Sequence, residues 1–164
     1  MNNYDKIKEI LHDLTIKEIL SNLSGNKIRE IQLVSDETVS CDANYLKAYF
    51  KTKVVSIILD EEEKADFIRK LSEHGWYILY KDVHESSRIH QEERYFHVAD
   101  IESINFKDLS SRKRGRTYHC LEINYKNTTA DIIYIHLDDP VNDTQYVIDS
   151  LKKAGRFDLL LKIS

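Results

Sequence analysis

The sequence predicts an α+β fold: an N-terminal helical segment, a strand–helix–strand unit, then an antiparallel sheet or partial barrel closed by a C-terminal helix. Three observations support this prediction. Apolar residues recur with a helical period near the N-terminus, a β-branched run precedes a capped helix, and several strand-like segments follow in succession. With 164 residues, 41% of them apolar, we expect one compact domain over residues 1–164. Sub-lobes 1–75 and 76–164 are an alternative division, but no linker marks a boundary near residue 75.

The first expected element is a helix that ends near Gly25. Its apolar positions share the i, i+3, i+4, i+7 spacing of one helix face: Ile7, Ile10, Leu11, Leu14, Ile19, Leu20 and Leu23. A strand is expected over residues 27–35. Residues 36–52 are undecided, because the stretch 40–50 suits either a short helix capped by Asp42 or an aromatic strand.

The clearest local signal lies in the middle of the chain. Residues 54–59 form an apolar, β-branched run that suits a strand buried on both faces. Asp60 then caps a helix, and Glu63 completes a pair resembling a capping box. The expected inner stripe of this helix is Ala65, Ile68 and Leu71. Gly75 ends the helix, and an aromatic strand follows over residues 76–83.

The second half predicts consecutive strands over residues 94–98, 101–106, 118–125 and 130–137. Pro140 begins a final helix that ends at Gly155, and the apolar segment 157–163 is expected to dock on the body. The inward positions of this helix are expected to be Val141, Val147, Ile148, Leu151 and Ala154. Glycines recur at positions 25, 75, 115 and 155, but the segments after them do not match, so no internal repeat is predicted.

One segment resembles a known family. In Tyr95-Phe96-His97-Val98-Ala99-Asp100-Ile101-Glu102-Ser103-Ile104, an aromatic strand precedes an Asp-Ile-x-x-Ile step. This arrangement resembles the strand junction of the bacterial PH-like small barrels, and the resemblance covers roughly residues 76–155. It implies a small barrel closed by one helix. It also implies a binding surface, which in some members of that fold recognises lipid headgroups.

Charge is distributed unevenly along the chain. The net charge is −4, but Lys107, Arg112, Lys113, Arg114 and Arg116 against Asp108 give the stretch 107–116 a charge of +4, which leaves −8 elsewhere. An acidic body with one basic protrusion argues against a dedicated duplex-DNA binder and permits a local anion contact. No run of about 18 apolar residues predicts a membrane span.

The segment 107–116 lies between two predicted strands and is therefore expected to be a projecting loop. Arginine presents a forked set of donors that matches phosphate or carboxylate. The candidate partner-binding residues are Lys107, Arg112, Lys113, Arg114, Arg116 and the outward-facing Tyr134. The alternative is a solvated hairpin loop whose charges only prevent edge-to-edge aggregation.

Catalytic signals are weak. No nucleophile elbow, glycine-rich phosphate loop or paired CxxC is present, and Cys120 is expected to be a small buried apolar residue. The best constellation for an enzyme is a metal site of His119, His136 and Asp138. Strand alternation argues against it, because His136 faces solvent if Ile135 faces the core.

These observations favour a non-catalytic cytoplasmic binding protein that needs no cofactor, and an inhibitor or immunity-type protein fits this description. The cytoplasm is expected because Cys41 and Cys120 do not form a disulfide framework and the first residues lack a secretory signal. The expected partner is a protein, with nucleic acid or anionic lipid as alternatives through the 107–116 loop. Two further alternatives are a metal-dependent hydrolase and a PH-like module for acidic lipid headgroups.

Overall fold

The computed structural model describes residues 2–37, 42–85, 89–111, 116–126 and 132–161. The chain begins with helix α1 (Asn3–Ser21) and continues through β1 (Ile28–Glu37), β2 (Asp42–Phe50), β3 (Val54–Leu59), α2 (Glu61–Glu73), β4 (Trp76–Glu85) and β5 (Ile89–His97). After a short 3₁₀ turn, η1 (Val98–Asp100), come β6 (Ile101–Ser111), β7 (Arg116–Tyr125), β8 (Ile132–His136), α3 (Pro140–Lys153) and α4 (Phe157–Leu161). The predicted α+β class is confirmed.

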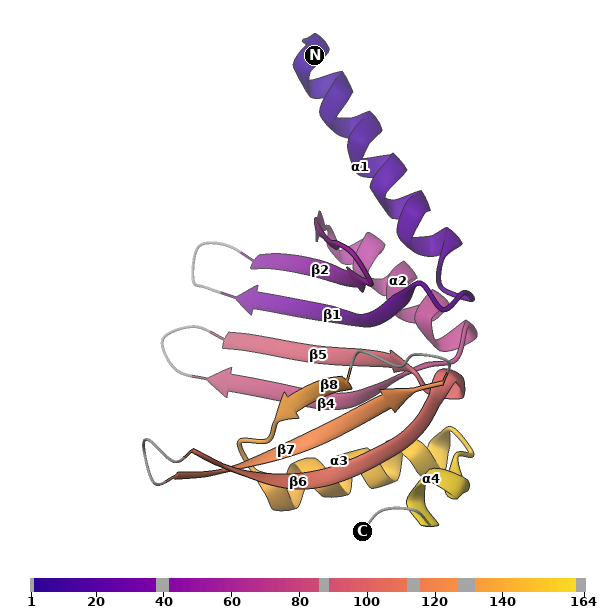
Figure 1. Cartoon of the computed structure of the whole chain (residues 1–164). Helices are drawn as coiled ribbons and strands as arrows, with labels where there is room; N and C mark the ends of the chain where they lie inside the picture. Colours follow the sequence, from indigo (N-terminus) through magenta and orange to yellow (C-terminus); the bar gives the residue numbers. More distant parts are fainter. Residues whose placement is uncertain (1, 38–41, 86–88, 112–115, 127–131, 162–164) are drawn as a thin grey trace.

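The strands form two antiparallel sheets. Sheet A has the order β3-β2-β1-β5-β4 and sheet B the order β6-β7-β8, and no closed barrel forms among the described residues. In Figure 1, α2, α3 and α4 lie behind the strands, while α1 extends away from the rest of the molecule. One side of each sheet therefore packs on helices, and the other side carries alternate side chains that no described helix covers.

A βββα arrangement occurs twice, which the sequence reading did not predict. Unit 1 comprises β1, β2, β3 and α2, and unit 2 comprises β6, β7, β8 and α3. The first two strands of each unit pair with a register shift at the same place, between Ile28 and Glu30 in unit 1 and between Ile101 and Ser103 in unit 2. The two units are thus equivalent strand by strand.

The equivalence extends to the core. The row Leu33–Leu46–Ile57 across unit 1 corresponds to Phe106–Leu121–Ile135 across unit 2. Both helices start after a buried Leu followed by Asp. From each helix into the residues after it runs the same pattern, apolar-Ile-x-x-Leu-x-x-x-Gly. Its residues are Phe67, Ile68, Leu71 and Gly75 in unit 1, and Val147, Ile148, Leu151 and Gly155 in unit 2. Both glycines have positive φ, 80° and 73° respectively, which suits a glycine after a helix end.

The β4–β5 hairpin connects the two hydrophobic cores. Trp76 and Tyr95 belong to the unit-1 core, which also contains Phe67 and Leu71 of α2. Leu79, Tyr80 and Phe96 of the same hairpin belong to the unit-2 core, with Val147 and Leu151 of α3 and Leu159 of α4. The hairpin therefore contributes apolar side chains to both units. The docking expected for residues 157–163 is confirmed at the fully buried Leu159, whereas Phe157 and Leu161 are exposed.

Several expectations about individual elements need correction. The undecided stretch 40–50 belongs to strand β2 where it is described, because it pairs with β1 and β3 on either side. The run 54–59 is an end strand of sheet A rather than a strand buried on both faces, and its alternate residues Val54 and Ile58 are exposed. In α2 the buried face contains Phe67 and Leu71, whereas the expected Ala65 and Ile68 are exposed; Val141 of α3 is exposed as well.

Candidate binding surfaces

Lys107 and Tyr134 lie on one face of sheet B. Lys107 on β6 pairs with Cys120 on β7, and Glu122, two residues further along β7, pairs with Tyr134 on β8. Directly opposed residues project to the same side, so these four side chains share a face. Tyr134 is 48% exposed, as the outward position predicted for it requires.

Lys107 is already engaged on this face. Its Nζ lies 2.5 Å from Glu122 Oε2, and the Glu122 side chain is almost completely covered. The hydrogen bond from Lys107, followed by that from Asn124, holds the pKa of Glu122 below its ordinary value, and Glu122 raises the pKa of Lys107. Both groups therefore stay ionised at neutral pH. An ammonium has three donors, so this ion pair leaves Lys107 able to contact a further acceptor.

The expected loop over residues 107–116 is wrong in its bounds, because residues 107–111 belong to β6 and residue 116 begins β7. Arg112, Lys113 and Arg114 lie outside the described residues. The backbone of Arg116 begins β7 and pairs with Ser111, but its side chain is also outside the description. The expected grouping of the basic residues with Tyr134 therefore stays a prediction.

Aromatic and imidazole groups extend the same face of sheet B. The rings of Tyr118 and His136 meet edge to face, with their centres 5.5 Å apart. Cys120 lies on β7, the central strand of sheet B, and is buried, and burial raises the pKa of its thiol. This agrees with the expectation of a small buried apolar residue, since a raised pKa disfavours the reactive thiolate. We call Lys107, Tyr118, Cys120, Glu122, Tyr134 and His136 the sheet-B face.

The three residues of the hypothetical metal site do not converge. His136 is opposite Cys120 in the β7–β8 pairing, so His119, the neighbour of Cys120, projects to the other side of the sheet. His119 contacts Asp108 at 2.6 Å and His136 contacts Asp138 at 3.2 Å, so each imidazole has a separate carboxylate. Within the described ranges, no three His, Cys, Asp or Glu side chains gather closely enough to hold a metal ion.

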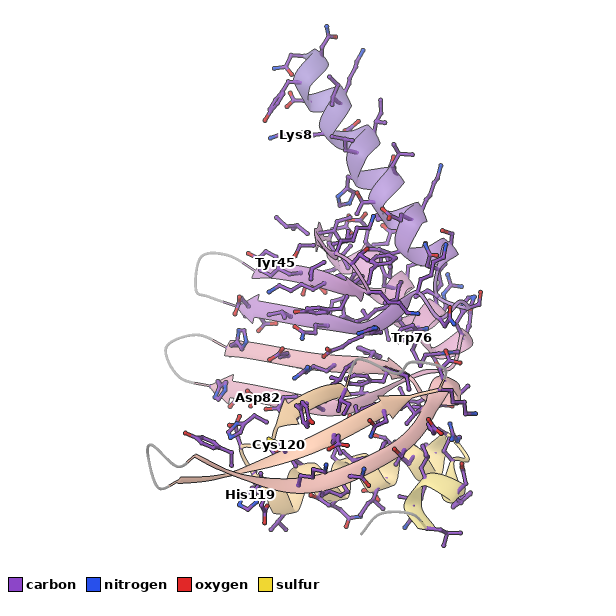
Figure 2. All side chains as sticks on the ribbon, in the orientation of Figure 1. Lys8, Tyr45, Trp76, Asp82, His119 and Cys120 are labelled. Atoms are coloured by element: carbon purple, nitrogen blue, oxygen red, sulfur yellow. The ribbon has the colours of Figure 1, made fainter. Side chains whose placement is uncertain are left out.

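A second uncovered surface lies on α1. The sequence predicts that Ile7, Ile10, Leu11 and Leu14 share one helix face, but it predicts neither their exposure nor the addition of Tyr4 to this face. Five large side chains, each 54% to 64% exposed, form what we call the α1 stripe: Tyr4, Ile7, Ile10, Leu11 and Leu14. Figure 2 shows the N-terminal part of this helix, with the labelled Lys8, extending beyond the strands. A contiguous apolar surface of this kind is typical of a site for another macromolecule.

The C-terminal part of α1 is firmly attached to unit 1. Ile19 and Leu23 are fully buried in the unit-1 core, and the Trp76 indole donates a hydrogen bond of 2.9 Å to the Leu23 carbonyl. Two polar contacts add to this: His12 with Glu63 at 2.9 Å, and Lys53 with Glu18 at 2.5 Å. The helix is therefore held at one end, and its stripe is presented to solvent at the other.

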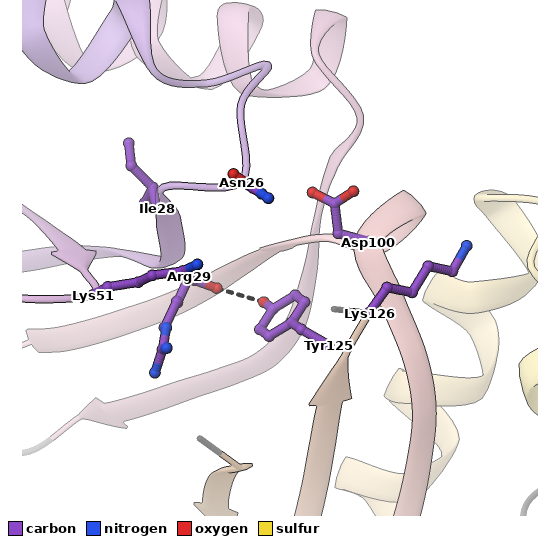
Figure 3. A pocket seen from close by; sticks show the side chains of 7 residues that line it. All are labelled: Asn26, Ile28, Arg29, Lys51, Asp100, Tyr125 and Lys126. Carbon is purple, nitrogen blue, oxygen red and sulfur yellow. Dashed lines mark hydrogen bonds between the residues drawn. The ribbon is translucent and has the colours of Figure 1, made fainter. Parts of the chain in front are cut away.

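Two open hollows, one beside His12 on α1 and one beside Tyr45 and His90 on sheet A, have volumes of about 440 and 370 Å³, and the two sites between packed elements are smaller. A groove between α2 and α3, floored by Trp76 and Tyr95, encloses about 230 Å³, less than the roughly 300–1,000 Å³ of typical ligand pockets. Figure 3 shows a second pocket where the units meet, beside the hydrogen bond from the Tyr125 hydroxyl to the Arg29 carbonyl. Its volume of about 20 Å³ holds little more than one water.

Comparisons of the chain with protein-family models, with curated proteins and with solved structures give no match. None of the helices that the structure describes is long and apolar enough to cross a membrane. The α1 stripe and the sheet-B face are accordingly the two candidate binding surfaces of the chain.

Proposed function

We propose that this chain is a non-catalytic protein-binding protein, comparable to inhibitor or immunity-type proteins that act by covering the surface of a partner. The observation that supports this most directly is the α1 stripe. Burying an apolar side chain from water contributes roughly 1.5–3 kcal/mol, so five half-exposed large side chains on one helix are a substantial source of binding energy.

The charges of α1 favour a protein over a membrane surface as the occupant of the stripe. Helices that bind anionic membranes are rich in Lys and Arg on their polar face. In α1 the acidic residues outnumber the lysines: Asp5, Glu9, Asp13 and Glu18 against Lys6, Lys8 and Lys17. Such a helix gains little from negative lipid headgroups, whereas an apolar groove of a protein accommodates its stripe without that requirement.

The sheet-B face is the second proposed contact surface. Tyr134 offers a large amphipathic ring that loses little conformational freedom on binding, and Lys107 offers a charge already held in place by Glu122. Together with Arg112, Lys113, Arg114 and Arg116 of the following segment, this surface suits an acidic region of the partner.

A pull-down with matched variants tests the proposal. The variant Ile7→Ser/Leu11→Ser changes the α1 stripe, and Lys6→Ser/Asp13→Ser changes the polar side of the same helix by the same type of substitution. All four side chains are exposed, so both variants should keep the melting temperature of the parent. We expect the first variant to lose the proteins captured from native lysate and the second to retain them.

Two further experiments test whether the sheet-B face takes part and whether the occupant is a lipid membrane. Reversing the charges of Arg112, Lys113, Arg114 and Arg116, or replacing Tyr134 by Ala, should weaken capture if the sheet-B face takes part. Identical capture by parent and stripe variant would contradict the proposal. Sedimentation of the parent with acidic liposomes, but not with neutral ones, would favour the lipid-binding alternative instead.

A further inference from the structure

The outer edge of β6 in unit 2 is equivalent to the edge of β1 in unit 1, and the β1 edge is paired with a strand. In unit 1, β5 pairs antiparallel with β1 from Ile31 to Glu37. In unit 2 the corresponding strand, β6, is an end strand of its sheet in the part of the chain that the structure describes. Edge strands present backbone N–H and C=O groups that can pair with another strand. The repeat therefore indicates which kind of element fits the β6 edge.

The two units differ because the chain takes different paths after the equivalent glycines. After Gly75 it returns as the β4–β5 hairpin, whereas after Gly155 it forms α4. Leu159 of α4 is buried in the unit-2 core, and Arg156 donates hydrogen bonds to the carbonyls of Val98 and Ile101 at the start of β6. This segment covers apolar side chains, but a helix cannot supply a ladder of backbone hydrogen bonds to the rest of β6.

We propose that β6 binds an extended, acidic segment of the protein partner as an antiparallel strand, an inference that rests on the protein-binding function proposed above. The pairing of β5 with β1 defines the chemistry of that segment. Tyr95 lies opposite Ile31, whose equivalent is Ile104, and Glu92 lies opposite Val34, whose equivalent is Lys107. The bound strand thus carries an acidic residue opposite Lys107 and, three residues later, an aromatic or apolar residue opposite Ile104.

Lys107 supports an acidic occupant, because neither acidic residue of β6 competes with it. Asp108 lies on the opposite face and contacts His119, and Glu102 precedes the stretch equivalent to the β1–β5 pairing. Lys107 is half-exposed and uses one contact for Glu122, so its ammonium can also bind a carboxylate on the incoming strand. Opposite charges placed directly across an antiparallel pair are stabilising.

A peptide with the sequence of β5, Ile-His-Gln-Glu-Glu-Arg-Tyr-Phe-His, is the probe for this edge, used with the full chain. Fluorescence anisotropy of the labelled peptide should show saturable binding, and hydrogen exchange should slow in β6 from Ser103 onward but not in β3, an end strand of the other sheet. Lys107→Glu should weaken binding about fivefold, and a peptide with Glu92→Lys should recover that loss.

The variant Lys107→Gln, which places no second carboxylate beside Glu122, should give an intermediate loss and guards against misfolding of the charge reversal. Slowed exchange at β1 with faster exchange in β4 would mean that the peptide displaces β5, which overturns the inference. If the Glu92→Lys peptide does not regain affinity for the Lys107→Glu variant, the inference is wrong. It is also wrong if hydrogen exchange in β6 slows with rising protein concentration in the absence of peptide, because the occupant of the edge is then a second copy of the chain. The α1 variants test the protein-binding function separately.

Discussion

Arg156 organises the junction between α3, α4 and β6. Its guanidinium donates to the backbone carbonyl of Val98, and at 3.0 Å to the carbonyl of Ile101 and to both carboxylate oxygens of Asp158. The hydrogen bond from Arg156 is the main reason that the pKa of Asp158 falls to about 2. A carboxyl whose pKa is lower in the folded state stabilises the fold above its unfolded pKa, and this contribution is lost as the pH falls through about 2.

Replacing Arg156 by Gln should therefore raise the pKa of Asp158 toward about 3.9, the ordinary value for aspartate. An NMR titration of the Asp158 carboxyl measures this change directly. The control is Arg69→Gln, which removes the partner of Asp66 on α2 and should leave Asp158 unaffected. A pKa that remains near 2 in the Arg156 variant would show that other groups hold the carboxylate ionised.

The residues whose roles depend on local sequence could be predicted, and those that depend on distant partners could not. Asp60 and Glu63 form the expected capping box, because both bonds lie within one helical turn. Tyr134 and His136 are exposed as alternation with Ile135 predicts. The exposure of Ile7 and Leu11 was not predictable, because an apolar stripe normally indicates a buried face and only the tertiary arrangement shows that nothing in the described chain covers it.

The helix ends of the two units provide a prediction about equivalent elements. Gly75 and Gly155 follow α2 and α3 with positive φ, whereas Gly25, after α1, does not have this conformation. A Cβ at Gly155 would meet nothing within 4 Å, and one at Gly75 would lie 3.4 Å from the His97 ring. Space is therefore available at both sites, so the left-handed backbone sets the cost of a substitution.

Gly75→Ala and Gly155→Ala should each lower the free energy of unfolding by about 1–2 kcal/mol, measured by urea denaturation. Gly155→Asn should cost less than Gly155→Ala, because asparagine tolerates this conformation better. Gly25→Ala is the control and should change stability little. Equal effects at Gly25 and Gly155 would contradict the role assigned to the left-handed conformation.

The existence of most elements was predictable, but their pairing was not. Val54–Leu59 was correctly identified as a strand, since β-branched residues favour this conformation, yet its place at the end of sheet A depends on β2 alone as its partner. The repeat was missed because its equivalent core positions hold different apolar residues, such as Ala48 and Ile123. In addition, the β7–β8 connection is longer than the β2–β3 connection, so equivalent residues drift apart along the chain.

The β4–β5 hairpin packs in both hydrophobic cores. Trp76 and Tyr95 contribute to the unit-1 core, while Leu79 and Phe96, on the same two strands, contribute to the unit-2 core. Loss of either core removes one of the surfaces on which the hairpin packs. We therefore expect the two units to unfold together, as small cooperative domains do.

Trp76 makes this expectation measurable, because it is the only tryptophan and lies in the unit-1 core. Leu121→Ala, in the central strand of unit 2, should lower stability by about 2–5 kcal/mol. Its urea midpoint should fall equally when followed by Trp76 fluorescence and by far-UV circular dichroism, and Leu46→Ala, at the equivalent position of unit 1, should behave alike. If Leu121→Ala lowered the dichroism midpoint but left the Trp76 midpoint unchanged, unit 1 would be stable without unit 2, and the hairpin would not couple them.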